Sequence, residues 1–364
     1  MHMLIFGHGY TAAALTPHLV GAGWTVSGTT RNDPPRVAGT GASPILWPGE
    51  ETRLRAELAR ADAILISVAP DRHASQSRVP PDISRADESD PIRPLHDSRT
   101  QAGPAEDPIS DTLRAAAPPD DRADAVIADF ATDLLAAHPR WVGYLSSTNV
   151  YGDHGGAWVD EMTPPNPGSP RAVARLRAEK AWAGLARNAG WPLTIFRLAG
   201  IYGPGRGPFA KLRSGTARRI VKPGQVFSRI HVEDIAGALM ASLGKEFVHP
   251  RSAMQGLAHV PDVPPAGVWP RPSPSAPDIY NICDDDPAPP EQVIELAAEL
   301  LGLPVPPAED FTHARMTPMA RSFYADSKRV RNDRMKRHLG YRLLYPDHRS
   351  GLAALLAAER CESS

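Results

Sequence analysis

The fold is decided by residues 3–12, MLIFGHGYTA, in which a short apolar run leads directly into a glycine turn. The run from Met3 to Phe6 has the composition of a buried strand. Residues 13–21 repeat apolar side chains at helical spacing, and residues 24–30, WTVSGTT, again favour a strand. The order strand, glycine turn, helix, strand predicts an α/β fold with a doubly wound parallel sheet, a Rossmann fold.

The residues of the turn fit a site for a dinucleotide. Gly7 lets the chain reverse sharply, and Gly9 has no Cβ, so that a diphosphate can approach the backbone. Ala12 is small enough for the helix to pack close to the sheet, while the N–H groups of Tyr10 and Thr11 point toward the phosphates. The alternative is an ordinary strand-to-helix turn that binds no nucleotide.

The end of the second strand indicates which dinucleotide is bound. Thr30 ends that strand and Arg31 follows it, whereas the nearest acidic residue, Asp33, comes later. An acidic residue at this place binds the ribose 2′-hydroxyl of NAD, while an Arg suits the 2′-phosphate of NADP. We therefore expect NADP(H) in preference to NAD(H). The alternative is that Arg31 is a solvated loop residue.

A further buried strand over 63–69 ends where a doubly wound sheet would meet the adenosine. Its last residues, Val68 and Ala69, are candidate cofactor contacts, although plain packing explains them equally well. Residues 71–122 then lose all apolar periodicity and are rich in Pro, Asp, Ser and Arg. This composition predicts a disordered insertion, with a lid over the site as the alternative.

The composition of the chain restricts the function classes. The 364 residues carry a formal net charge of −1, which gives no electrostatic footprint for nucleic acid. Two cysteines, Cys283 and Cys361, lie too far apart for a metal motif and indicate a reducing compartment. No apolar run reaches the length of a membrane span. We expect a cytoplasmic protein that binds no metal, nucleic acid or membrane.

Four stretches, taken together, resemble one family. They are the glycine turn at 7–12, LSSTNVYG at 145–152, RLAGIYGPG at 197–205 and IHVEDIA at 230–236. In order and spacing they are similar to the extended short-chain dehydrogenases/reductases, the NAD(P)-dependent epimerases and dehydratases. The glycine turn and the tail over 327–341 are most similar to the atypical branch of YeeZ-like proteins. The resemblance implies an oxidoreductase, and a homodimer that pairs through helices flanking the sheet.

The resemblance also implies catalytic positions, and here the chain departs from the family. Ser147 matches the Ser that hydrogen-bonds the reacting oxygen. The Tyr and Lys of the family's Y-x-x-x-K motif correspond to Arg171 and Arg175, and Arg cannot serve as a base because it stays protonated. Arg175 can still supply positive charge near the nicotinamide ribose, and Arg171 can bind an anionic substrate group; a solvated basic face is the alternative. The letters of the motif recur at Tyr324 and Lys328, too far downstream to be catalytic.

Other residues near the same strand end can interact with a substrate. Tyr151 is a candidate acid, with a packing role as the alternative, and Asp153 and His154 follow it. Asn149 and His231 are candidate substrate contacts, although a His in such a strand is usually structural. The full set of residues assigned to the cofactor is Gly7, Gly9, Tyr10, Thr11, Thr30, Arg31, Val68, Ala69, Ser146, Leu198 and Ile201.

Two regions and two functions are expected. Residues 1–205 form the dinucleotide-binding domain, and residues 206–364 form a smaller substrate lobe, interrupted by a second Pro-rich insertion over 246–277, that also returns elements to the sheet. The first function is an NAD(P)-dependent oxidoreductase or epimerase that transfers hydride to or from a sugar nucleotide or other small hydroxyl or carbonyl substrate. The second is a catalytically silent NADP(H)-binding sensor or scaffold, which the loss of the Tyr and Lys favours.

Overall fold

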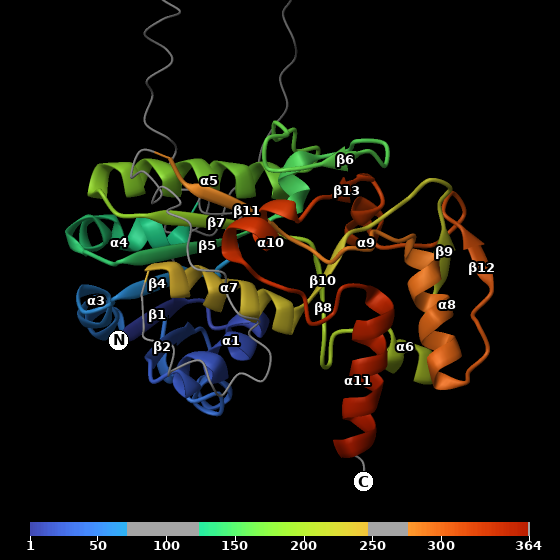
Figure 1. Cartoon of the computed structure of the whole chain (residues 1–364), viewed down its shortest axis with the longest axis horizontal. Helices are drawn as coiled ribbons and strands as arrows, with labels where there is room; N and C mark the ends of the chain where they lie inside the picture. The colour runs from blue at the N-terminus through green and yellow to red at the C-terminus, as the bar shows by residue number, and fades with distance from the viewer. Residues whose placement is uncertain (71–123, 247–275, 363–364) are drawn as a thin grey trace, which may run out of the picture.

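The computed structural model describes residues 1–70, 124–246 and 276–362 (Figure 1). The insertion expected over 71–122, whether disordered or a lid, and most of that expected over 246–277 lie outside these ranges.

A parallel sheet of seven strands forms the centre of the molecule. The strands are β1 (His2–Phe6), β2 (Thr25–Thr30), β3 (Ser43–Leu46), β4 (Ala63–Ile66), β5 (Trp141–Ser147), β7 (Leu193–Leu198) and β11 (Asp278–Ile282). Their order across the sheet is β11-β7-β5-β4-β1-β2-β3. From β1 the chain first adds β2 and β3 on one side, and it then crosses to the other side of β1 to add β4 and the later strands. The prediction of a doubly wound α/β sheet is therefore confirmed.

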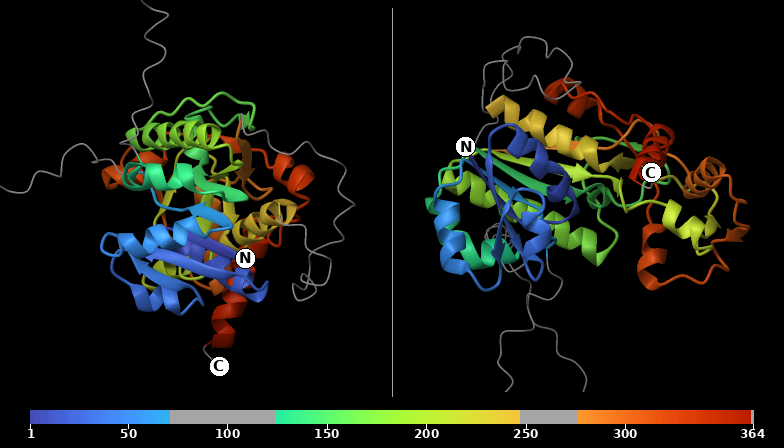
Figure 2. Two further views of the ribbon diagram at one scale, coloured as in Figure 1. Left: turned by 90° about the vertical axis from the view of Figure 1, so that its left-hand side faces the viewer. Right: turned by 90° about the horizontal axis from the view of Figure 1, so that it is seen from below.

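Helices cover both faces of this sheet (Figure 2). One face carries α1 (Tyr10–Gly21), α7 (Val232–Glu246) and α10 (Asp333–Leu339), and the other carries α3 (Glu51–Ala59), α4 (Ala125–Ala136) and α5 (Pro170–Ala189). Alternation along β1 explains the two layers, since Met3 and Ile5 pack in the core of the first face and Leu4 and Phe6 in that of the second. Parallel strands buried on both faces read as continuous apolar runs, as β1 and β4 do.

The smaller lobe lies to the right of the sheet in Figure 1. It contains helices α6 (Phe209–Arg213), α8 (Pro290–Leu301), α9 (Pro318–Phe323) and α11 (His348–Glu362). Three two-stranded sheets pair β8 (Gly200–Tyr202) with β10 (Arg229–His231), β9 (Arg219–Val221) with β12 (Ala308–Asp310), and β6 (Trp158–Val159) with β13 (Arg329–Val330). Helix α6 ends at Arg213, because Gly215 follows with a positive φ of +66° and Arg219 enters β9.

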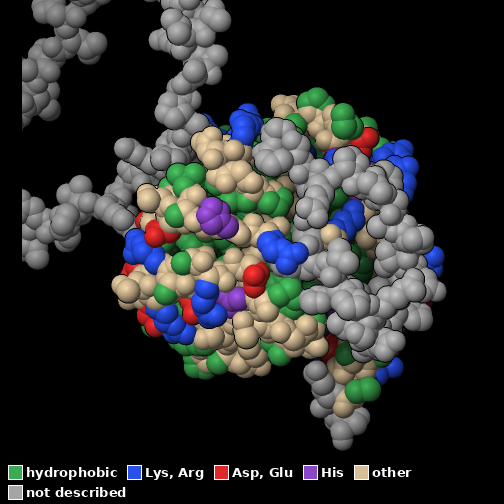
Figure 3. Space-filling model, turned by 60° about the vertical axis from the view of Figure 1, so that its left-hand side comes forward, with side chains coloured by type: hydrophobic (Ala, Val, Ile, Leu, Met, Phe, Trp, Pro, Cys, Tyr) green, Lys and Arg blue, Asp and Glu red, His purple; other side chains and the backbone are tan. Residues whose placement is uncertain are grey.

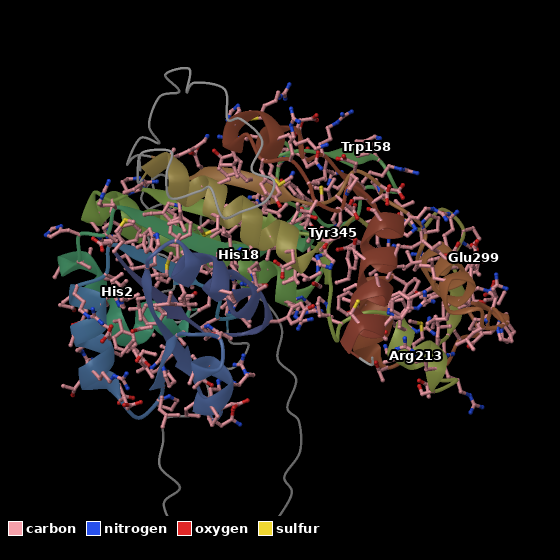
Figure 4. All side chains as sticks on the ribbon, turned by 60° about the horizontal axis from the view of Figure 1, so that its bottom comes forward. His2, His18, Trp158, Arg213, Glu299 and Tyr345 are labelled. Atoms are coloured by element: carbon pink, nitrogen blue, oxygen red, sulfur yellow. The ribbon has the colours of Figure 1, made fainter. Side chains whose placement is uncertain are left out.

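A buried carboxylate fastens the chain after α10 to the sheet layer. Asp234, in the first turn of α7, accepts hydrogen bonds from the Tyr341 hydroxyl at 2.9 Å, the Leu344 N–H at 2.6 Å and the Tyr345 N–H at 3.1 Å. Tyr345 marks this junction in Figure 4. Nearby, His18 of α1 points toward α7 and pairs with Glu233 at 3.0 Å, which raises the pKa of the imidazole. The IHVEDIA stretch therefore joins three segments that are distant in sequence.

The surface is mixed in charge. On the face drawn in Figure 3, Lys and Arg side chains alternate with Asp and Glu side chains. Within the described part of the chain, no helix combines the length and apolar character that crossing a membrane requires.

Candidate functional site

The glycine turn between β1 and α1 is held by the neighbouring strands. The N–H of Gly7 donates to Thr29 Oγ1 at 2.7 Å, and the N–H of His8 donates to the Thr29 carbonyl at 2.8 Å. Gly7 has φ +82°, and a Cβ there would lie 2.7 Å from Val68 Cγ2 and 2.9 Å from Val68 N. Val68, two residues after the end of β4, therefore packs directly on the turn, and a glycine is required for both conformation and space.

The next glycine, Gly9, is different, because a Cβ there would meet no close neighbour. Gly9 is the N-cap of α1 with φ −95°, and no side chain caps the helix. A Cβ built on Gly9 would meet the Gly7 carbonyl at 3.9 Å and nothing nearer. The N–H groups of the first turn have no acceptor within the helix, and no acidic side chain lies in that turn. These residues fit the diphosphate of a dinucleotide, which needs donors and open space at this point.

His8, between the two glycines, is buried and contributes no charge. Its Nε2 lies 2.9 Å from Thr16 Oγ1, and its ring fills the space over Gly28, where a Cβ would come within 2.6 Å of the ring. Burial, followed by the charge of Arg36, lowers the pKa of His8 to about 4. The imidazole is therefore neutral near pH 7, and its role is to pack β1 against β2.

Two arginines flank the end of β2. Arg31 is exposed immediately after Thr30. Arg36, in the short helix α2 (Pro34–Ala38), donates from Nη2 to the His8 carbonyl at 2.5 Å, and Asp33 caps that helix by accepting from the Arg36 N–H at 3.1 Å. Sequence reasoning missed Arg36. The signal was present, since Asp followed by two prolines marks a helix start that turns the next residues back toward the strand end.

The remaining residues assigned to the cofactor have mixed surroundings. Val68 and Ile201 are half-buried and Ala69 is exposed at the carboxyl edge of the sheet, whereas Thr11, Thr30 and Leu198 are buried. Ser146 does not face a cofactor with its side chain, because the hydroxyl is buried and donates to Glu179 at 2.5 Å. Glu179 also accepts from Arg197, at 3.1 Å from Nε and 2.8 Å from Nη2, in an ion pair that is almost fully buried.

Ser147, one residue further, lies at the surface of the same strand end. It is half-buried and is the N-cap of the 3₁₀ turn η3 (Thr148–Tyr151), where its Oγ accepts from the Asn149 N–H at 3.2 Å. Asn149 is likewise half-buried. Both side chains are therefore partly exposed at the carboxyl end of β5.

Tyr151 is fully buried. Its hydroxyl donates to Asn281 Oδ1 at 2.8 Å, and the guanidinium of Arg197 lies 4.9 Å from the ring centroid. Burial raises the pKa of the phenol, which disfavours proton release. The packing role, given above as the alternative for Tyr151, is the one that this geometry fits.

The two arginines at the Y-x-x-x-K positions differ in their contacts. Arg175 donates from Nη1 to the Leu145 carbonyl at 2.8 Å and to the Tyr144 hydroxyl at 3.2 Å, so it ties α5 to β5. Arg171, one turn earlier, is exposed. The two guanidinium groups therefore have different surroundings.

His231 has a structural environment. It is buried between Tyr202, with ring centroids 5.2 Å apart, and Tyr345, at 4.1 Å, and its Nδ1 accepts from the Glu233 N–H at 3.2 Å. Burial lowers its pKa to about 4. Lys328, from the second Y-x-x-x-K match, is also buried and donates to the Gly152 carbonyl at 2.9 Å, which fixes the chain after η3.

His154, seven residues after Ser147 in sequence, is a further candidate and lies in the loop that follows η3. The half-buried ring has Nε2 3.1 Å from the Tyr151 carbonyl. A carbonyl can only accept, so Nε2 carries the hydrogen and Nδ1 is the nitrogen that can exchange a proton with a ligand.

Comparison with known proteins agrees with this architecture. The sequence model of the NAD dependent epimerase/dehydratase family matches residues 124–252. The chain is 43% identical to a functionally unknown conserved protein from Silicibacter pomeroyi, whose solved structure superposes with a TM-score of 0.69 over 98% of this chain and 99% of that chain.

Two curated relatives match in part. Protein YeeZ of Escherichia coli is 38% identical over 111 residues, which are 29% of this chain and 37% of that protein. GDP-6-deoxy-D-mannose reductase of Pseudomonas aeruginosa is 25% identical over 199 residues, which are 54% of this chain and 57% of the reductase. The matches thus span between about a third and somewhat over half of these relatives. With its parallel sheet, its glycine turn and these matches, the chain belongs to the NAD-dependent epimerase/dehydratase family.

Proposed function

We propose that the protein binds NADP(H) at the carboxyl edge of the sheet and transfers hydride to or from a small hydroxyl or carbonyl substrate. The observation that carries the proposal is the start of α1, where Gly9 leaves open space beside N–H groups that no side chain caps. The family supports nicotinamide chemistry, and the name of the matched reductase makes sugar nucleotides the first substrate class to test.

The preference for NADP(H) rests on Arg31 and Arg36. Both lie at the end of β2, where the adenosine ribose binds in a sheet of this topology. Asp33, the nearest acidic residue, uses its carboxylate to cap α2 and to pair with Arg36 at 3.4 Å. A carboxylate occupied in this way is a poor partner for a ribose 2′-hydroxyl, while two guanidinium groups suit a 2′-phosphate.

The chemistry at the other end needs an oxygen-binding group and a proton donor. The bound nicotinamide supplies or accepts the hydride. Ser147 accepts from a backbone N–H through Oγ, which leaves its own proton free to bind a substrate oxygen. In place of the family's Tyr, we propose that His154 exchanges the proton, because Tyr151 is buried and the two arginines stay protonated.

The alternative is a protein that binds NADP(H) without turnover. The contacts of Arg175 favour it, since a guanidinium committed to the Leu145 carbonyl does not replace the family's Lys. Measuring NADPH binding and NADPH consumption separates the two functions. Turnover requires that NADPH consumption depend on an added substrate, whereas a sensor would bind NADPH equally well and consume none.

The test begins with fluorescence titrations of the full chain with NADPH and NADH. We expect tighter binding of NADPH, and we expect Arg31→Ala and Arg36→Ala each to weaken NADPH by about tenfold with little effect on NADH. Arg337→Ala, an exposed arginine on α10, is the matched control. Equal losses for both cofactors would contradict the 2′-phosphate assignment, and no binding of either would contradict the proposed function itself.

Turnover is then sought by following NADPH oxidation with a panel of sugar nucleotides and simple carbonyl compounds. His154→Gln should abolish any activity found, without changing the affinity for NADPH. The proposed homodimer is tested separately by the sedimentation velocity of the same preparation.

A further inference from the structure

A turn from the smaller lobe reaches back to the first residue of α1. The turn, residues 203–206, follows β8, and the Tyr10 hydroxyl donates to the Pro204 carbonyl at 2.9 Å. The guanidinium carbon of Arg206 lies 5.6 Å from the centroid of the Tyr10 ring, within range of a cation–π contact. Tyr10 is the residue directly after Gly9, so Arg206 is held beside the proposed diphosphate site.

The turn itself is closely constrained. Gly203 and Arg206 exchange two backbone hydrogen bonds, Gly203 N–H to the Arg206 carbonyl at 3.1 Å and Arg206 N–H to the Gly203 carbonyl at 2.9 Å. A Cβ on Gly203 would lie 2.5 Å from the Tyr10 hydroxyl oxygen and 2.7 Å from Val232 Cγ1. Gly205 adopts a positive φ of +67°. The position of Arg206 relative to Tyr10 therefore follows from backbone geometry on both sides.

Arg206 has a charge without a counterion. Its side chain is exposed, and among the residues that the structure describes, no carboxylate pairs with it. The diphosphate of a dinucleotide has the opposite requirement. The first turn of α1 offers it neutral N–H groups, and His8 is uncharged near neutral pH. The N-terminus of α1 supplies only partial positive charge, so a full positive charge at the diphosphate has to come from another element.

We propose that Arg206 binds the diphosphate of the cofactor from the lobe side, so that the cofactor bridges the start of α1 and the turn at 203–206. The inference rests on the proposed function, since it requires a dinucleotide at Gly9. It assigns Arg36 and Arg206 to different phosphates. Arg36 lies at the His8 carbonyl, on the ribose side of the turn, and Arg206 lies over Tyr10, on the side of the lobe.

The consequence is a coupling between cofactor and lobe. With the dinucleotide bound, the guanidinium exchanges its contact with the Tyr10 ring for a charge-assisted hydrogen bond, which is stronger than an exposed cation–π contact. The lobe, which in this family would carry the substrate, is then drawn to the sheet by the cofactor. Cofactor binding should therefore protect the 203–206 turn from hydrogen exchange.

The experiment uses two ligand fragments that differ in the diphosphate. ADP-ribose 2′-phosphate contains the diphosphate and the 2′-phosphate, whereas adenosine 2′-monophosphate contains the 2′-phosphate alone. Isothermal titration calorimetry is carried out on the full chain and on Arg206→Gln, Arg36→Gln and Lys211→Gln. Lys211, an exposed cation on α6 a few residues further along the lobe, controls for net charge.

We expect Arg206→Gln to weaken ADP-ribose 2′-phosphate by about tenfold and to leave adenosine 2′-monophosphate unchanged. Arg36→Gln should weaken both fragments, and Lys211→Gln neither. Arg206→Lys, which keeps the charge, should recover part of the loss. Unfolding curves without ligand should change only slightly for Arg206→Gln, because the side chain is exposed and loses a single cation–π contact.

Two results would overturn the inference, and they are distinguishable. If the wild type binds ADP-ribose 2′-phosphate and Arg206→Gln binds it equally well, the role of Arg206 is refuted while the cofactor site stands. The same holds if Arg206→Gln and Lys211→Gln weaken the ligand equally, since the effect would then be one of net charge. If the wild type binds neither fragment, both the inference and the proposed function fail.

Discussion

Replacing Gly9 by Ala should separate folding from cofactor binding. The backbone of Gly9 is extended, with φ −95° and ψ −155°, and a Cβ would meet the Gly7 carbonyl oxygen at an ordinary contact distance of 3.9 Å. The methyl group therefore costs no contact, and the loss of glycine's freedom in the unfolded chain should stabilise the protein by about 0.4–1 kcal/mol. Gly7→Ala is the opposite case. Its positive φ costs about 1–2 kcal/mol, and its Cβ would clash with the backbone of Val68.

The same Gly9→Ala substitution should weaken the binding of NADPH. The methyl group would enter the space through which a diphosphate reaches the N–H groups of α1, and each charge-assisted hydrogen bond lost is worth about 1.5–3 kcal/mol. The affinity for NADPH should fall by at least about tenfold. Urea unfolding without ligand and NADPH fluorescence titration check the two halves. A Gly9→Ala protein that binds NADPH like the wild type would refute the placement of the diphosphate. A clearly lower free energy of unfolding for Gly9→Ala would contradict the conclusion that a methyl group fits at this position.

Three further predictions concern the interior. Glu179→Gln should lower the free energy of unfolding by about 3–5 kcal/mol in urea titrations, because it leaves the Arg197 charge buried and unpaired; a loss below about 1 kcal/mol would show that water reaches the pair. Tyr151→Phe should lower the free energy of unfolding by about 1 kcal/mol, because the hydrogen bond to Asn281 is lost, and it should leave any kcat unchanged. A large fall in kcat would show that Tyr151 takes part in the reaction. Burial raises the pKa of Asp284 to about 8, so the folded chain keeps a proton that the unfolded chain releases, and stability should fall as the pH rises from about 4 to 8. Asp284→Asn should remove that slope in thermal melts at several pH values, and an unchanged slope would contradict the assignment.

The parts of the fold that could be predicted are those encoded locally. The glycine turn and the apolar runs of β1 and β4 carry their own signals, and each lies where the sequence predicts it. Short elements such as α2 and β8 were missed, because two to five residues carry too little periodicity to stand out.

The candidate site was less predictable, because burial depends on distant partners. Tyr151 and His231 have functional residue types at plausible positions, yet Asn281 and Tyr345 enclose them from other parts of the chain. Ser146 and Ser147 are neighbours with the same side chain, and the strand period of two sends them to opposite faces. Arg206 could not be selected from sequence, since its place beside Tyr10 depends on a contact across 194 positions.

The order of strands in the sheet has a consequence for synthesis on the ribosome. β7 is covered at its outer edge by β11, which begins at Asp278, and β11 pairs with it over five residues. As the chain emerges, β7 is complete long before β11, and its unpaired N–H and C=O groups form an exposed edge in the nascent protein. Translation stalled between these strands should yield a domain prone to aggregation, which release of the remaining chain would rescue.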